Sequence, residues 1–178
     1  MKIVSILLSL CLALMLLPSG SQALTMKKEQ TETSEAEVEK LMGVANKFIE
    51  VAPSLEGEDA LGLAQLIEQL KNDNETKMLL EQMRSGKGGH HPELQESIKN
   101  APKNELMVGM INIYDELKAI DILFTDPNRA VEAVNDEGMI EDKERLELYR
   151  KNPAALEADM RSGLYITFVY VAEAAGFL

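Results

Sequence analysis

Hydrophobic residues recur every three or four positions along most of the chain, which is the spacing of one face of an α-helix. The first such stripe lies between Ser34 and Pro53. Ser34 and Glu37 form a capping box at its start, and Pro53 ends the pattern. We therefore predict a helix over 34–52. Its apolar stripe consists of Val38, Leu41, Met42, Ala45, Phe48, Ile49 and Ala52.

The same spacing predicts further helices, separated by Gly, Asn and Pro residues. Their expected ranges are 58–70, a segment ending at Gly86, 92–99, 105–122, 127–134, 142–150 and 153–175. No stretch alternates with a period of two for long enough to indicate a strand. The pattern predicts an all-α fold, namely one compact, bundle-like domain of about seven to eight helices over residues 34–178.

Two of these helices are the most apolar. The helix over 105–122, for which we expect Asn104 as the cap, has two apolar edges and should be central. The stretch from Gly163 to Leu178 contains a single charged residue, Glu173. It is too short for a membrane span, which needs about 20 residues. We expect a core helix there, with an exposed surface that docks a partner as the alternative.

The N-terminal segment has the features of a secretory signal. Lys2 precedes an apolar run over 3–17, and small residues up to Ala23 provide a cleavage site. We predict a signal peptide over 1–23 and a disordered lead-in over 24–33. The apolar run is shorter than a spanning helix, so a retained membrane anchor is the less favoured alternative, and no integral span is expected after signal removal.

Charge and cysteine content narrow the function classes. The chain has 18 basic and 30 acidic residues, and loss of Lys2 with the signal leaves 17 − 30 = −13. This charge disfavours nucleic acid and anionic lipid surfaces. Cleavage also removes Cys11, the single cysteine, so the mature protein has no disulfide. Its 155 residues are long enough to bury about 68–70% of the unfolded surface without one.

No motif in the sequence predicts a catalytic residue, a cofactor or a metal site. His90 and His91 with Glu93 are too few for a closed zinc site, and solvated loop histidines are the simpler interpretation. An acidic group around Gly138 fails as a calcium loop because Ala133 occupies the first ligand position. Its members are Asp136, Glu137, Glu141 and Asp142. We therefore expect a protein that is not an enzyme.

Two candidate sites remain. Asn74 begins an Asn-Glu-Thr sequon in an expected inter-helix turn, which makes it a glycosylation candidate. Apolar side chains of the two most hydrophobic helices could line a cavity for an apolar ligand, although filling of the core by methionine is the favoured interpretation. This apolar-ligand set consists of Met107, Met110, Tyr114, Leu164 and Phe168.

The C-terminal third contains four segments with a distinctive amino-acid sequence. They are Asp126–Val131, Tyr149–Pro153, Leu156–Arg161 and Gly163–Val169. In these segments the chain resembles the C-terminal half of small helical proteins of diatoms and related algae. The resemblance implies no activity and no site residues. It implies one alternative location, the plastid, because in such algae a signal peptide can precede a transit segment. Leu24 fits that arrangement, whereas the acidic residues from Glu29 onward disfavour it.

These observations predict a secreted or lumenal, non-enzymatic helical protein that binds or scaffolds an unidentified protein partner. The first alternative is a carrier of a small apolar ligand in a helical cavity. The second is a plastid-lumen subunit associated with a membrane complex. A hydrolase built on carboxylates is the least favoured class, because paired carboxylates are expected in any chain this acidic.

Overall fold

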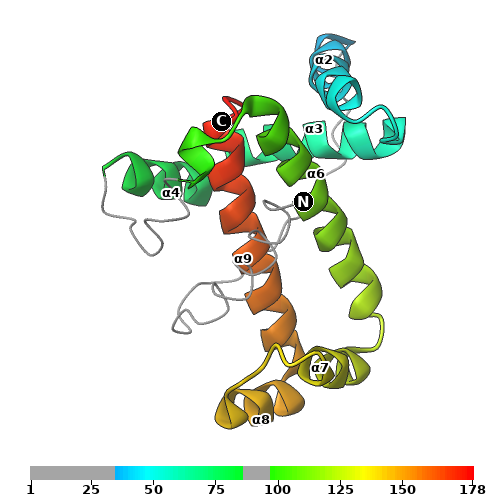
Figure 1. Cartoon of the computed structure of the whole chain (residues 1–178), viewed down its shortest axis with the longest axis vertical. Coiled ribbons are helices and arrows are strands. Elements are labelled where there is room, and N and C mark those ends of the chain that lie inside the picture. The colour runs from blue at the N-terminus through cyan, green and yellow to red at the C-terminus, as the bar shows by residue number, and fades with distance from the viewer. Residues whose placement is uncertain (1–34, 86–96) are drawn as a thin grey trace. The chain divides into compact units, whose positions relative to one another are not determined.

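The structure is a computed structural model that describes residues 35–85 and 97–178. These residues form helices and contain no strand, which confirms the all-α, multi-helix prediction (Figure 1). The helices are α2 (Glu35–Val51), α3 (Gly57–Asn72), α4 (Asn74–Arg84), α6 (Lys103–Leu123), α7 (Pro127–Asp136), α8 (Lys143–Lys151) and α9 (Pro153–Ala174). Residues 97–100 are also helical.

Capping residues fix several helix starts. The Asp126 carboxylate accepts a hydrogen bond from the Arg129 amide at 3.2 Å, and the Asp142 carboxylate accepts one from the Glu144 amide at 2.8 Å. Both satisfy backbone donors that have no partner within the helix. The expected cap at Asn104 is wrong. The Pro102 carbonyl accepts the first helical hydrogen bond of α6, which places Asn104 inside the first turn.

The described residues divide into two compact units. In unit 1 they are residues 115–167, which comprise the second half of α6, α7, α8 and most of α9. In unit 2 they are residues 35–85, 97–114 and 168–178, which comprise α2, α3, α4, the first half of α6 and the end of α9. The expectation of one domain over 34–178 stays a prediction.

The core of unit 1 is built from apolar residues of every helix in it. Tyr149 of α8 is buried with them. The fully or nearly fully buried members are Leu117, Ile120, Phe124, Ala130, Val131, Val134, Leu156 and Leu164. Helices α7 and α8 are consecutive in the chain and contact each other, as expected for helices joined by a short connection.

In unit 2, α3 lies between two neighbours, because both α2 and α4 contact it. Alanines allow α2 and α3 to approach closely. Ala45 of α2 packs with Ala60 and Ala64 of α3, and partly buried leucine, valine and isoleucine side chains surround them. The first half of α6 buries a wide arc, as predicted. Its buried residues are Leu106, Met107, Met110, Ile111 and Ile113.

The C-terminal helix contributes to the core, as predicted, with buried side chains from Leu164 to Phe177. It closes with a turn at Gly176, which has a φ of +76°. The Phe177 amide donates to the Ala172 carbonyl at 2.9 Å, which is the hydrogen bond of a Schellman motif. This turn brings Phe177 back against Phe48 of α2, and the two rings stack with centroids 5.3 Å apart.

Candidate functional site

The apolar stripe of α2 divides into a packed half and an open half. Ala45 and Phe48 are buried, and Ile49 is half-buried. Val38 and Met42 continue the same stripe at helical spacing toward the N-terminus, yet each is 47% exposed. Amphipathic helices normally direct such a stripe toward the core. Leu41, which stands between Val38 and Met42 in the sequence, packs against the alanine cluster of α2 and α3. The open half therefore consists of Val38 and Met42, the edge of the stripe that the described residues leave uncovered.

The packed half is held firmly. Phe48 is 0% exposed and stacks on Phe177, and the Lys103 ammonium lies 5.4 Å from the Phe177 ring centroid. Such a cation over an aromatic face is attracted by the ring quadrupole. The C-terminal half of α2 is thereby joined to α6 and to the end of the chain, as well as to α3.

One polar contact fixes α2 to α3 near the open half. The Lys40 ammonium donates to Glu68 at 2.6 Å, and the Lys71 ammonium donates to the other Glu68 oxygen at 2.7 Å. Burial of Glu68 opposes its ionisation, but the hydrogen bonds from the two lysines outweigh this effect and lower the pKa of the Glu68 carboxyl. The positive charge of Lys40 is therefore directed at α3.

Carboxylates border the exposed apolar residues. Glu35 precedes Val38 by three positions, and Glu39 precedes Met42 by three, so all four residues share one side of the helix. Both glutamates are exposed, and neither has an ion-pair partner among residues 35–85 and 97–178. We call Glu35, Val38, Glu39 and Met42 the open face of α2. It presents apolar surface with an acidic edge and no basic side chain.

A second polar cluster lies in unit 1. The buried Tyr149 hydroxyl donates to Asp159 at 2.7 Å and accepts a hydrogen bond from the Arg145 Nε at 2.7 Å. Arg145 also donates to Asp159 at 3.2 Å. Burial, together with the Asp159 carboxylate, raises the pKa of Tyr149 to about 12, against the opposing effect of Arg145. The phenol therefore stays protonated at neutral pH and ties α8 to α9.

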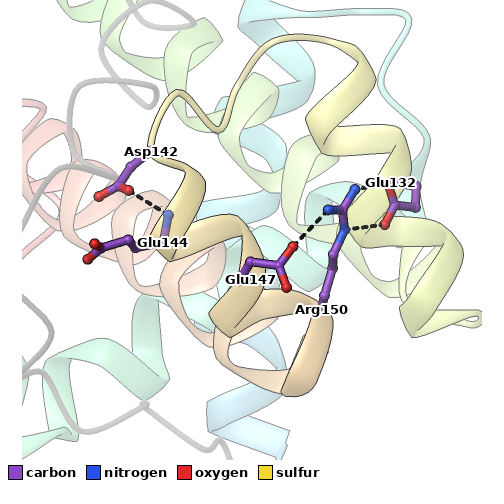
Figure 2. Close-up of polar contacts among 5 residues, drawn as sticks. All are labelled: Glu132, Asp142, Glu144, Glu147 and Arg150. Carbon is purple, nitrogen blue, oxygen red and sulfur yellow. Dashed lines mark hydrogen bonds and ion pairs between the residues drawn. The ribbon is translucent and has the colours of Figure 1, made fainter.

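Figure 2 shows a third cluster, in which Arg150 of α8 lies between two carboxylates. Its guanidinium donates to both oxygens of Glu132 on α7, at 2.8 and 2.9 Å, and to Glu147 at 3.0 Å. All three side chains are substantially exposed. A bidentate arginine–carboxylate pair fixes orientation, so this cluster joins α7 to α8 at their surface.

Metal ligands do not gather in the part of the chain that the structure describes, since no group of three or more His, Cys, Asp or Glu side chains there could hold an ion. This includes the acidic residues around Gly138. Instead, Asp142 caps α8. His90, His91 and Glu93 lie outside the described residues, as do the predicted signal peptide and lead-in.

The sequon lies at a helix start and not in a turn of its own. Asn74 is exposed and is the first residue of α4. Its neighbour Thr76 is buried, and the Thr76 hydroxyl and amide both donate to the capping Asp73 carboxylate, at 2.9 and 2.7 Å. The expected inter-helix turn is a single residue, Asp73, because that residue ends α3 and caps α4. Glycosylation of Asn74 stays a prediction.

The proposed apolar-ligand residues do not fall in one unit. Met107, Met110, Tyr114 and Phe168 belong to unit 2, whereas Leu164 belongs to unit 1. All are buried except Tyr114, which is half-buried. The Tyr114 hydroxyl lies directly against Gly62 of α3, where a β-carbon would overlap it. Tyr114 therefore packs closely against a helix, and its role as a cavity residue stays a prediction.

Comparisons of the chain with family models, with curated proteins and with solved structures find no match. Within 35–85 and 97–178, no helix combines the length and the apolar character needed to cross a membrane.

Sequence reasoning missed the open face, because it placed Val38 and Met42 in one apolar stripe with Ala45 and Phe48 and did not separate covered from uncovered members. The relevant signal was present in Glu35 and Glu39, which border these two residues and leave them an acidic edge. The periodicity alone could not identify how far the stripe is covered, since that depends on where α3 and the C-terminal turn lie.

Proposed function

We propose that this protein is a secreted or lumenal, non-enzymatic binding module that contacts a protein partner through the open face of α2. The observation that carries the proposal is the 47% exposure of both Val38 and Met42 on an otherwise packed stripe. Single exposed apolar residues are ordinary, whereas aligned residues on one helix face form a surface that another chain can cover.

The energetics suit a modest, reversible contact. Full burial of a valine or methionine side chain contributes about 1.5–3 kcal/mol, so covering the exposed half of each would contribute about 1 kcal/mol per residue. The open face extends over Glu35 to Met42, eight residues, or roughly 12 Å at 1.5 Å per residue. A partner must add contacts elsewhere to exceed the entropic cost of association.

The test compares the mature chain with Val38→Gln/Met42→Gln, using affinity capture from extract of the source cells after cross-linking. Glutamine preserves helix propensity and removes apolar surface. Met78→Gln is the matched control, because Met78 is 60% exposed and belongs to a different helix, α4. We expect proteins that the native chain and Met78→Gln capture to be lost from the double variant. Identical captured sets for all three chains would contradict the proposal.

The location is part of the same proposal. The test expresses the full chain with a C-terminal fluorescent tag in an algal host. Fluorescence gives the location of the protein, and sequencing gives its mature N-terminus. We expect a mature start at Leu24, with fluorescence outside the cell or in the endomembranes. Fluorescence in the plastid with further trimming would instead favour the plastid-lumen alternative.

A further inference from the structure

We infer that the partner of the open face is an amphipathic helix of another protein, with an apolar stripe bordered by lysine or arginine. The inference rests on the proposed function and specifies the chemistry of its partner. Three features of the described residues support it: the spacing of the apolar residues, the sign of the charges beside them, and the direction of the nearby lysines.

The spacing favours a helical partner. Val38 and Met42 stand one turn apart and form a short ridge along α2. Such ridges fit between the side chains of a second helix, in the packing that amphipathic helices use in grooves and coiled coils. The neighbouring packed half provides a rigid base, because Phe48 is fully buried and Ala45 nearly so.

The charges favour a basic partner. Glu35 and Glu39 border the ridge, and Glu50 continues the same edge two turns beyond Met42. All three carboxylates are exposed. Complementary charges across an interface steer association and exclude unsuitable partners. A helix with lysine or arginine beside its apolar stripe would place a cation opposite each of these glutamates.

The same charges disfavour other occupants. Lys40 lies on the other side of α2 and pairs with Glu68 of α3, so it does not offset the acidic edge. A second copy of this chain would bring carboxylates against carboxylates, which is unfavourable. Anionic lipid surfaces and nucleic acid would be repelled in the same way. A basic helix is the occupant that satisfies both the apolar ridge and its edge.

The experiment measures binding of fluorescent peptides to the full mature chain by anisotropy. The probe is an 18-residue amphipathic peptide of leucine and lysine. Two controls are a leucine–glutamate peptide of the same pattern and a leucine–lysine peptide of the same composition with scrambled order. We expect the patterned leucine–lysine peptide to bind most tightly, with affinity that falls as salt increases.

Variants then separate the ridge from the edge. Val38→Gln/Met42→Gln should weaken binding of the leucine–lysine peptide by about tenfold or more, and Met78→Gln should leave it unchanged. Glu35→Gln/Glu39→Gln should weaken binding several-fold and reduce its salt dependence. Glu56→Gln/Glu81→Gln removes the same charge from exposed positions elsewhere, and it controls for attraction by the net charge alone.

The outcomes are distinguishable. The inference would be overturned if the leucine–glutamate or the scrambled peptide bound as tightly as the patterned leucine–lysine peptide. It would also be overturned if Glu56→Gln/Glu81→Gln weakened binding as much as Glu35→Gln/Glu39→Gln. If the peptides fail to bind while Val38→Gln/Met42→Gln still loses captured proteins, the basic-helix inference is wrong and the proposed function stands. If the double variant changes neither peptide binding nor the captured proteins, both are wrong.

Discussion

The two halves of α2 share one amphipathic pattern but differ in what surrounds them. In the C-terminal half, Phe48 is 0% exposed and stacks on the ring of Phe177. In the N-terminal half, every residue from Glu35 to Lys40 is exposed, including the apolar Val38. The connecting residues are helical throughout, and Leu41 of the N-terminal half packs on the core. The difference therefore lies in which edge of the stripe the neighbouring segments cover.

This difference shows that helical periodicity reports a face and not its burial. An apolar helix face can be covered by other segments of the same chain or by another chain. The half that packs on α3 and Phe177 stabilises the fold. The other half retains apolar side chains that the described residues leave open, and the proposed binding function rests on this exposure.

The largest effect is expected from truncation in the packed half. Phe48→Ala should lower the free energy of unfolding by about 3–5 kcal/mol, since it removes a buried ring and leaves a cavity. Met42→Ala, in the open half, should change it by less than about 0.5 kcal/mol. Urea denaturation followed by circular dichroism measures both. Similar values for the two variants would mean that the halves do not differ as described.

Glycine substitutions should differ in sign between the two regions. A β-carbon at Gly62 would overlap the Tyr114 hydroxyl and lie 2.9 Å from Tyr114 Cζ, whereas one at Gly43 meets nothing within 4 Å. Gly62→Ala should therefore destabilise by about 1–3 kcal/mol through overpacking. Gly43→Ala, in the middle of α2, should stabilise by about 0.5–1 kcal/mol through reduced backbone entropy of the unfolded chain.

Thermal unfolding of Gly62→Ala and Gly43→Ala tests this contrast. The double variant Gly62→Ala/Tyr114→Phe is measured beside them. Removal of the hydroxyl should restore part of the stability that Gly62→Ala loses. A stabilising Gly62→Ala would show that Tyr114 does not approach α3 closely.

A substitution in the C-terminal turn should weaken the packing of Phe48 in α2, although the two lie far apart in the sequence. Gly176 has a φ of +76°, where a β-carbon is strained. Gly176→Ala should destabilise by about 1–2 kcal/mol, because alanine disfavours the left-handed turn that returns Phe177 to Phe48. The unfolding midpoint should fall, and peptide binding at the open face should be unchanged. If the folded Gly176→Ala variant lost peptide binding, the two halves of α2 would be coupled.

The smallest effect concerns the contact between Lys40 and Glu68. The pKa of Glu68 is lower in the folded protein than its ordinary value, so its contribution to stability is complete above that ordinary value. It is lost as the pH falls through the lowered pKa. The difference in unfolding free energy between the native chain and Glu68→Gln should shrink from pH 7 to pH 3. Its size should be below about 1 kcal/mol, as for other partly exposed ion pairs.

Lys40→Gln should remove part of the same pH-dependent difference, because Lys71 still pairs with Glu68. A difference that grows toward acid pH would contradict the lowered pKa.

Much of the secondary structure followed from local chemistry. Proline and aspartate located the starts of α7 and α8, and the spacing of apolar residues located α2, α3 and α6. The error at Asn104 arose because a cap depends on which backbone carbonyl accepts the first hydrogen bond, and the Pro102 carbonyl does so. Pro102 and Asn104, two positions apart, offer alternative starts, and local propensity does not choose between them.

The candidate site was less accessible to sequence reasoning. Val38, Met42 and Phe48 belong to one broad apolar stripe, in which Val38 and Met42 stand about 80–120° around the helix from Phe48. The periodicity does not specify which edge of so broad a stripe is covered. The contact between Tyr114 and Gly62 joins residues 52 positions apart, and that between Phe48 and Phe177 joins residues 129 apart. Such pairings depend on how helices pack, which periodicity does not specify.

The sequence by itself determined the helices, the starts of α7 and α8, the acidic character and the apolar C-terminal segment, because these depend on the residues themselves and on interactions within a few turns of each other. Only the tertiary structure decided which part of each apolar stripe is covered. Burial depends on the surfaces that distant segments bring together. On α2, the C-terminal turn covers Phe48, whereas the described residues leave Val38 and Met42 half-exposed.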